Sequence, residues 1–173
     1  MKIHNIWELD KIRQTGLRSL SPKRQKISIS MSTCGLALGA DQIFREMNSV
    51  KEKQGLKISL AQTGCSGFCD LEPMAIVRQG GKPPLLYTKM TPEKAKKLIK
   101  DVKRKKITKE GLLCRLGEID PSGRKGDGVF EKIPEYKDTA PFKNQYRVLL
   151  SSCGIIDPLS VAEYGHGRML CIV

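Results

Sequence analysis

The sequence predicts an α/β fold whose elements follow the order β-α-β-β-β-α between about residues 25 and 107. Three observations support this prediction. Two short strand-like segments are joined by a segment with a helical apolar stripe, a second pair of strands follows a tight turn, and a strongly amphipathic helix ends the series. Because a helix joins the first two strands, we expect them to be parallel, with a right-handed crossover.

The first strand and its helix open this unit. The segment "KISISMS" alternates Ile27, Ile29 and Met31 with serines, which is typical of a strand buried on one face. The helix that follows runs to about Lys53, and "LKISLAQ" is the second strand. The apolar face of the helix consists of Ile43, Phe44, Met47 and Val50.

The second half of the unit is a hairpin followed by a helix. In "PMAIVRQGGKPPLLYTKM", a Gly-Gly-Lys-Pro-Pro turn is too short to join two strands in any other way. Thr91 and Pro92 have the residue types preferred at the N-cap and the first position of a helix. The expected buried face of this helix consists of Ala95, Leu98, Ile99 and Val102.

An N-terminal helix and linker are predicted over residues 1–24, before the first strand. The helix covers about residues 5 to 15, with Ile6, Leu9 and Ile12 on one side and Gly16 as its stop signal. The stretch "RSLSPKRQ" is interpreted as the linker.

The net charge of +13 is concentrated in one part of the chain, where the run Lys89–Lys109 carries ten Lys or Arg residues against two acids. These side chains form either an ordinary solvated helix face or a docking patch for an acidic partner, and we give the two interpretations equal weight. A nucleic-acid partner is disfavoured, because aromatic residues are few and no RNA-binding or helix-turn-helix signature is present.

The cysteines are interpreted from the expected compartment. The charged N-terminus "MKIHNIWELDKIRQTGL" lacks the apolar region of a secretory signal, and no window is long enough to span a membrane. We therefore expect a cytoplasmic protein, in which the six cysteines are free thiols or metal ligands rather than disulfides.

Three of these cysteines follow the first two strands. Cys34 comes after the first strand, and Cys65 and Cys69 come after the second. The ends of parallel neighbouring strands lie at the same end of a sheet, so we expect the three thiols to converge. Cys34, Cys65 and Cys69 are therefore the candidate metal-binding and cofactor-binding residues, and no catalytic residue is expected.

Two segments resemble a known family. "GCSGFCDLEPMAIVRQGGKPPLLYTKMTPEKAKKLI" resembles the second half of the thioredoxin-like [2Fe-2S] ferredoxin domain, and "STCGLALGADQIF" resembles its first cluster loop and following helix. Such domains occur alone, as small subunits of NADH dehydrogenases, and at the N-terminus of the flavin-containing, NADH-binding beta subunit of bifurcating hydrogenases. The resemblance implies a thioredoxin-like fold and a [2Fe-2S] cofactor.

The resemblance also implies a domain organisation. Residues 25–110 correspond to the ferredoxin domain, and residues 111–164 resemble the connector that leads to the flavin domain of the hydrogenase beta subunit. The tail at residues 165–173 does not resemble that subunit's continuation, which predicts a truncated or frameshifted gene product or a fragment. No glycine-rich phosphate loop is present, so we expect no FMN or NADH site and no NADH oxidation by this chain alone.

The family holds its cluster with four thiolates, and this sequence offers three. The family's leading cysteine corresponds to Ile29, an inward-pointing strand residue that cannot be a ligand. The fourth ligand is therefore unknown. The candidates to complete a cluster are Ser30, Ser32, Thr33 and Cys114.

Other interpretations of the three thiols stay open. The cluster can be lost, which leaves a cluster-free thioredoxin-like domain. Zinc is disfavoured because His4 and His166 lie at opposite ends of the chain, and a redox dithiol is disfavoured because Cys65 and Cys69 are one residue too far apart for a Cys-x-x-Cys motif. Asp70 and Glu72 are interpreted as surface charges or loop caps.

Two functions follow from these observations. The first is one-electron transfer through a [2Fe-2S] cluster within an NADH dehydrogenase or electron-bifurcating hydrogenase complex, with the other redox subunits as partners. The alternative is a cluster-free adaptor that docks to a partner subunit through its basic helix.

Overall fold

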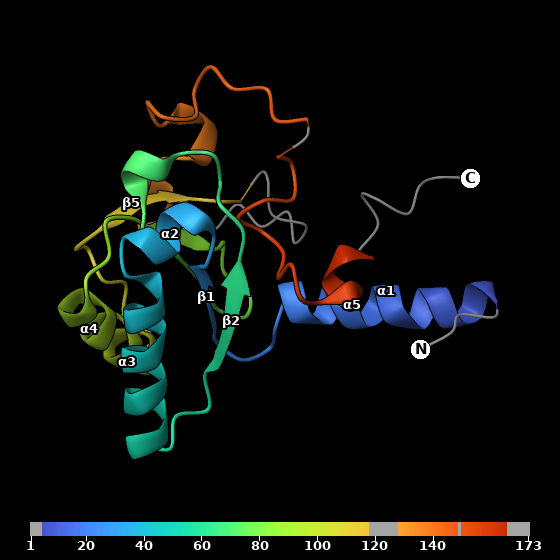
Figure 1. Ribbon diagram of the computed structural model, residues 1–173, viewed down its shortest axis with the longest axis horizontal. Coiled ribbons are helices and arrows are strands. Elements are labelled where there is room, and N and C mark those ends of the chain that lie inside the picture. Colours follow the sequence, from blue (N-terminus) through green and yellow to red (C-terminus); the bar gives the residue numbers. More distant parts are fainter. Residues whose placement is uncertain (1–4, 118–127, 149, 166–173) are drawn as a thin grey trace.

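A five-stranded mixed β-sheet with strand order β2-β1-β3-β4-β5 forms the centre of the computed structural model, which describes residues 5–117, 128–148 and 150–165 (Figure 1). The strands are β1 (Lys26–Ser30), β2 (Ser59–Thr63), β3 (Ala75–Arg78), β4 (Leu85–Tyr87) and β5 (Leu112–Arg115). The α-helices are α1 (Ile6–Leu20), α2 (Thr33–Ala37), α3 (Ala40–Lys53), α4 (Pro92–Lys103) and α5 (Val161–Tyr164). Three short 3-10 helices are η1 (Cys69–Leu71), η2 (Gly128–Lys132) and η3 (Tyr136–Asp138).

The strand pairing confirms the predicted α/β order. β1 and β2 are parallel, with Ser30 opposite Thr63, and α3 makes the crossover between them. β3 pairs antiparallel with β1 and with β4, so the Gly-Gly-Lys-Pro-Pro segment closes a hairpin.

One face of the sheet packs against α3 and α4, as the apolar stripes predict. Thr91 caps α4 by accepting a hydrogen bond from the Lys94 N–H at 3.3 Å, and Pro92 is the first residue of the helix. The buried faces of the two helices meet the inward side chains of β1, β3 and β4 in one core. This core includes Ile27, Ile29, Ile43, Met47, Val77, Leu85, Tyr87, Leu98, Ile99 and Val102.

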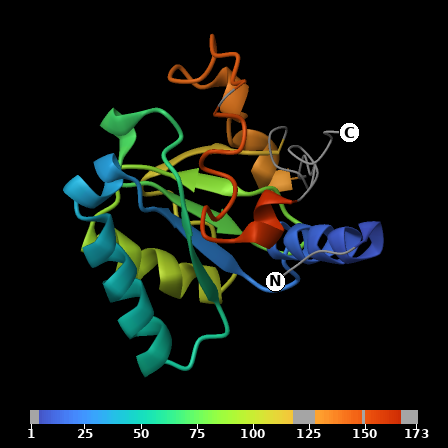
Figure 2. The ribbon, with the colours of Figure 1, turned by 45° about the vertical axis from the view of Figure 1, so that its right-hand side comes forward.

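The opposite face of the sheet is covered by the C-terminal part of the chain, drawn in orange and red in Figure 2. A second apolar cluster lies there and consists of Met74, Ile76, Leu86, Cys114, Leu116, Tyr136 and Phe142. As a result all five residues of β1 are buried, including Ser28 and Ser30. The prediction that β1 is buried on one face only was wrong, because the alternation of serines did not reveal the covering segment.

β5 belongs to the segment that the sequence assigned to the connector. It pairs antiparallel with β4 and places Cys114 opposite Leu86 in the second apolar cluster. The sheet therefore continues past residue 110.

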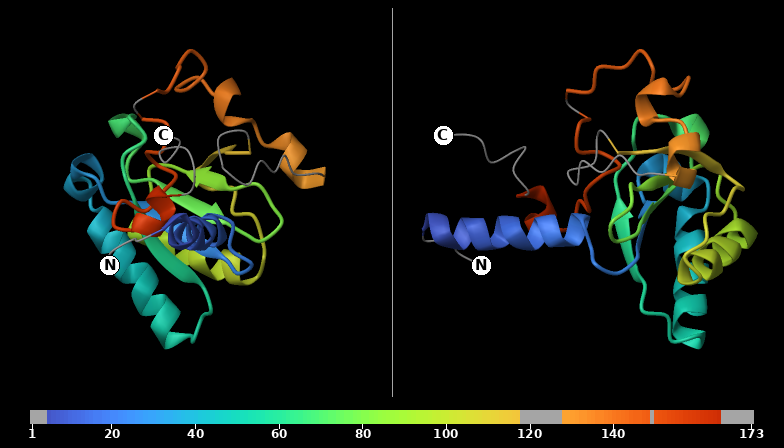
Figure 3. Two further views of the ribbon diagram at one scale, coloured as in Figure 1. Left: turned by 90° about the vertical axis from the view of Figure 1, so that its right-hand side faces the viewer. Right: turned by 180° about the vertical axis from the view of Figure 1, so that it is seen from behind.

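α1 continues through Gly16 to Leu20 and projects to the side of the sheet, with α5 against it (Figure 3). A Cβ atom on Gly16 would lie 1.8 Å from the carbonyl oxygen of Ala162. The prediction that Gly16 stops the helix was wrong, because this glycine permits the close approach of α5 instead. Ile6, expected on the buried side, is 74% exposed.

A buried ion pair joins β1 to α5. The Lys26 ammonium contacts the Glu163 carboxylate, and the two side chains are 4% and 3% exposed. Glu163 also accepts hydrogen bonds from the Ser19 hydroxyl and from the Asp157 N–H at 2.7 Å. Burial acts to raise the pKa of Glu163, but the hydrogen bonds from Lys26, Ser19 and Asp157 outweigh it and hold that pKa below its ordinary value.

In the part of the chain that the structure describes, no helix is both long enough and apolar enough to cross a membrane.

Replacing Glu163 with glutamine is expected to lower the free energy of unfolding by about 3 to 5 kcal/mol at neutral pH, because Lys26 then stays buried without a counter-charge. Urea unfolding followed by circular dichroism measures the loss. The double variant Lys26→Met with Glu163→Gln keeps one acceptor oxygen for the Asp157 N–H, leaves an amide NH2 from which the Ser19 hydroxyl can accept a hydrogen bond, and removes the unpaired charge, so it should lose much less. Equal losses in the single and double variants would contradict a role for the ion pair.

The same ion pair predicts a dependence of stability on pH. A carboxyl whose pKa is lower in the folded than in the unfolded chain stabilises the fold above its ordinary pKa of 4.5 and loses this contribution as the pH falls through the folded value. We therefore expect the stability difference between the wild type and Glu163→Gln to shrink in acid. Unfolding midpoints measured from neutral to acidic pH test this, and a difference that does not change with pH would argue against it.

Candidate metal centre at the cysteine loops

Cys34 lies in α2, directly after β1. The Ser32 side chain caps this short helix by accepting a hydrogen bond from the Gly35 N–H at 3.5 Å. A Cβ atom on Gly35 would lie 2.4 Å from the carbonyl oxygen of Ser30, so only glycine allows α2 to fold back this closely on the end of β1. The Cys34 side chain is half-buried.

Cys65 and Cys69 lie in the loop after β2. Gly67, between them, has a φ of +94°, in the left-handed region that favours glycine. This conformation lets the Gly67 N–H donate a hydrogen bond to the Cys65 Sγ at 3.3 Å. Cys65 is half-buried, whereas Cys69, which begins η1, is exposed.

The structure brings the cysteines of the two loops together. The Sγ atoms of Cys34 and Cys69 are 2.8 Å apart, although the residues are separated by 35 positions. The Cys65 thiol in turn interacts with Cys69. The two loops therefore converge as expected, with Cys34 and Cys69 in contact and Cys65 beside Cys69.

Within residues 5–117, 128–148 and 150–165, no group of three or more His, Cys, Asp or Glu side chains is already arranged to hold a metal ion.

Glu72 is a buried neighbour of the thiols that the sequence analysis misread. It follows η1 and is only 4% exposed, so its interpretation as a surface charge was wrong. The Ser30 hydroxyl donates to Glu72 Oε1 at 2.6 Å, the Met74 N–H donates to Oε2 at 3.0 Å, and the carboxyl also interacts with Cys65. No sequence pattern marks this burial, which depends on the packing of β1 and β3. Asp70, by contrast, has a side chain that is 88% exposed and pairs with Lys89 at 3.5 Å, as expected of a surface charge.

The pKa values of Cys65, Cys69 and Glu72 are all raised above their ordinary values. Burial raises the pKa of Cys65, against the opposing hydrogen bond from Gly67, and the negative charge of Glu72 adds to the increase. The hydrogen bond with Cys34 raises the pKa of Cys69. Burial likewise raises the pKa of Glu72 despite its hydrogen bonds. A bound cation would reverse these effects by favouring the charged forms.

The other residues that the sequence analysis considered as ligands are buried elsewhere, bind other partners or lie outside the described residues. Ile29 is fully buried in the main core, as predicted for a residue that cannot be a ligand. Cys114 is buried in β5, and β5 and β2 form opposite edges of the sheet; burial raises its pKa to about 12. Ser30 donates to Glu72. His4 and His166 lie outside the described residues.

The C-terminal segment lies over the Cys65–Cys69 loop. Thr63 donates a hydrogen bond to the carbonyl oxygen of Ile156 at 3.0 Å, and a Cβ atom on Gly154 would lie 3.2 Å from the Ser66 side chain. The ring of Phe68 packs edge-on against Phe142 with centroids 4.7 Å apart. This segment and the second apolar cluster therefore shield one side of the loop.

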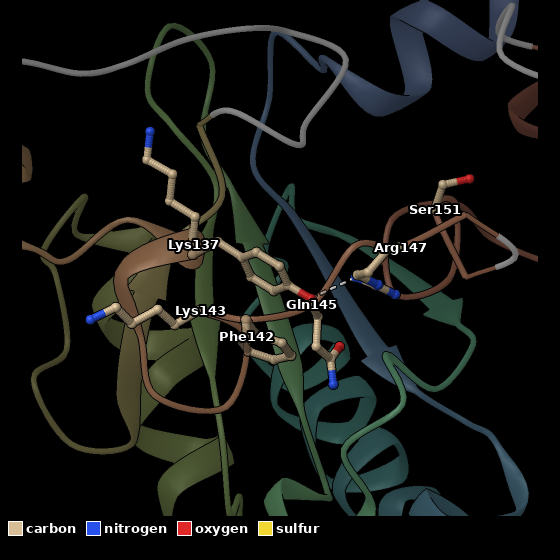
Figure 4. A pocket seen from close by; sticks show the side chains of 7 residues that line it. Lys137, Phe142, Lys143, Gln145, Arg147 and Ser151 are labelled. Carbon is tan, nitrogen blue, oxygen red and sulfur yellow. Dashed lines mark hydrogen bonds between the residues drawn. The ribbon is translucent and has the colours of Figure 1, made fainter.

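A small pocket lies within the C-terminal segment, beside Phe142 (Figure 4). Its volume is about 190 Å³, below the roughly 300 to 1,000 Å³ of typical small-molecule sites. Arg147 points toward the Tyr136 hydroxyl, to which it donates a hydrogen bond at 2.7 Å, and it also donates to the carbonyl oxygens of Leu150 and Cys153. Arg147 therefore anchors the covering segment.

The basic run forms an exposed surface on and after α4. Some of its lysines pair with acids, as Lys96 does with Glu46 at 3.2 Å and Lys97 with Glu110 at 3.1 Å. A hollow of about 280 Å³ next to it is lined in part by Lys23, Arg24, Lys82 and Lys105. The remaining exposed basic side chains of the run are Lys89, Lys100, Lys103, Arg104, Lys106 and Lys109.

Comparisons with known proteins find similarity over about half of this chain. The model of the thioredoxin-like [2Fe-2S] ferredoxin family matches residues 18–103. The chain is 26% identical over 88 residues to the NADP-reducing hydrogenase subunit HndB of Solidesulfovibrio fructosivorans, which covers 50% of this chain and 70% of HndB. A solved structure of a thioredoxin-like [2Fe-2S] ferredoxin from Aquifex aeolicus aligns with 54% of this chain and 93% of its own, at 11% identity and a TM-score of 0.46. Residues 18–103 of this chain are therefore a member of the thioredoxin-like [2Fe-2S] ferredoxin family.

Proposed function

We propose that this domain binds a [2Fe-2S] cluster through Cys34, Cys65 and Cys69 and transfers single electrons within a multi-subunit redox complex. The observation that carries the proposal is the 2.8 Å approach of the Cys34 and Cys69 sulfurs, which come from two different loops, with Cys65 beside them. When bound, the cluster would accept and donate one electron at a time.

The donor set fits such a cluster. Each iron of a [2Fe-2S] cluster takes two protein ligands, so the donors are divided between two metals and do not need to surround a single ion. Three thiols from two converging loops provide three of the four donors. The Gly67 N–H that reaches the Cys65 sulfur is the type of hydrogen bond that tunes the potential of a thiolate-held cluster.

The surroundings of the thiols suit electron transfer. Phe68, Phe142 and the segment around Gly154 shield one side of the loop from water. Cys69 is exposed, so an electron-transfer partner can approach the site from the side on which Cys69 lies. A reducing cytoplasm is the compartment that we propose, because it keeps such thiols available as ligands.

The partners that we propose are other subunits of a flavin-containing and iron-sulfur-containing redox complex, of the NADH dehydrogenase or electron-bifurcating hydrogenase type. The similarity to HndB, a subunit of an NADP-reducing hydrogenase, supports this choice. The exposed basic surface around α4 is suited to docking against an acidic subunit. The same surface supports the second candidate function, a cluster-free adaptor that uses only this docking.

Anaerobic reconstitution with iron and sulfide is expected to give a brown protein with about two iron ions per chain and an EPR signal after reduction. Cys65→Ser should reduce the bound iron to background. Cys153→Ser is the matched control, because Cys153 is a half-buried free cysteine outside the three thiols, and it should bind iron like the wild type. Colourless wild-type protein without iron would favour the adaptor.

The contact between Cys34 and Cys69 can be tested separately in iron-free protein. Diamide is expected to link them, taking up both thiol protons and one electron from each sulfur as the disulfide forms. Peptide mapping by mass spectrometry identifies the linked pair. Reconstituted protein should resist the reaction, since its sulfurs are bound to iron. Preferential linkage of either residue to Cys153 would contradict the arrangement of the loops.

A further inference from the structure

Glu72 lies between the structural elements that carry the three cysteines. It follows η1, which begins with Cys69, and it accepts a hydrogen bond from the hydroxyl of Ser30 at the end of β1. Its Oε2 lies 3.4 Å from the position that a Cβ atom on Gly35, the neighbour of Cys34, would take. The same carboxyl interacts with Cys65. Glu72 therefore adjoins both cysteine loops.

The environment of Glu72 differs from that of the other buried glutamates in the described part of the chain. Glu163 pairs with Lys26, and Glu135 pairs with Arg115 at 2.9 Å. The hydrogen-bond partners of the Glu72 carboxyl are the Ser30 hydroxyl, the Met74 N–H and the Cys65 thiol, and none of them is a cation. Burying a carboxylate without a positive charge is costly, so this position favours a neutral carboxyl or a carboxylate bound to a metal.

We infer that Glu72 is the fourth, oxygen donor of the [2Fe-2S] cluster whose thiol donors are Cys34, Cys65 and Cys69. The inference rests on the proposed function. Carboxylates are established ligands of iron in proteins, and three thiolates with one carboxylate carry the same total charge as four thiolates. Ser30 and the Met74 N–H orient the carboxylate, as hydrogen-bond partners of metal ligands commonly do.

This assignment explains how the site can be complete although Ile29 occupies the position of the family's leading cysteine. Ile29 is in the main core and cannot reach a metal. Ser30, the next residue, points to the opposite face of the sheet and contacts Glu72 instead. The donor is therefore provided from the second loop rather than from the first strand.

The test compares wild-type protein with Glu72→Gln and Glu72→Cys after anaerobic reconstitution. Glutamine keeps the size and an acceptor oxygen but removes the anionic donor, so Glu72→Gln should lose iron to a chelator faster than the wild type, by about tenfold or more. Glu72→Cys restores an anionic donor and should retain iron, with altered visible absorption and EPR spectra. Asp70→Asn, which removes the exposed carboxylate of the same loop, is the control and should match the wild type.

X-ray absorption at the iron edge of wild-type protein tests the ligand directly and does not depend on the folding of any variant. We expect an oxygen atom among the nearest neighbours of iron, in addition to sulfur. Sulfur neighbours alone, or Glu72→Gln with wild-type iron retention and spectra, would overturn the assignment of Glu72 while leaving the cluster in place. A wild-type chain that binds no iron would instead overturn the proposed function and this inference together.

Discussion

The parallel pairing of β1 with β2 is the constraint on which the site depends. Because Ser30 is opposite Thr63, the two strands end level with each other, and the chain leaves both at the same end of the sheet. The α2 segment with Cys34 and the loop with Cys65 and Cys69 must then lie side by side. The crossover helix α3 fixes this pairing by packing its apolar face on the sheet and against α4. A slip of one residue in the register would also turn Ile27 and Ile29 away from the main core.

Two buried glutamates illustrate how their surroundings determine the charge of a carboxyl group. Glu163 is held against Lys26, and its pKa falls below the ordinary value even though burial opposes this change. Glu72 has neutral hydrogen-bond donors only, and burial raises its pKa. The first carboxylate is stabilised within the fold. Among the described residues, no cation pairs with the second carboxyl, which is a property expected of a group that binds a cation.

The sequence predicts those parts of the fold that follow from local periodicity. The strand around Ile27, the apolar stripe of α4 and its cap at Thr91 were predicted correctly, although the serine alternation of the strand wrongly indicated burial on one face only. The convergence of the cysteine loops followed from the crossover. Features that depend on a distant covering segment were not predictable in this way. The burial of Ser28 and the close approach at Gly16 result from residues 128–164, whose short turns and 3-10 helices carry little periodic signal. Glu72 was also misread, because its burial depends on the packing of β1 and β3, whereas a glutamate before a proline in a loop normally indicates an exposed position.

The ion pair between Lys26 and Glu163 also affects where the folding unit ends. The family model ends at residue 103. However, Glu163 of α5 neutralises the buried ammonium group of Lys26 in β1, and the residues before α5 lie over the Cys65–Cys69 loop. The packed unit that the structure describes therefore extends beyond the stretch defined by similarity. Removal of the C-terminal segment would expose the apolar side chains that β3, β4 and β5 contribute to the second apolar cluster.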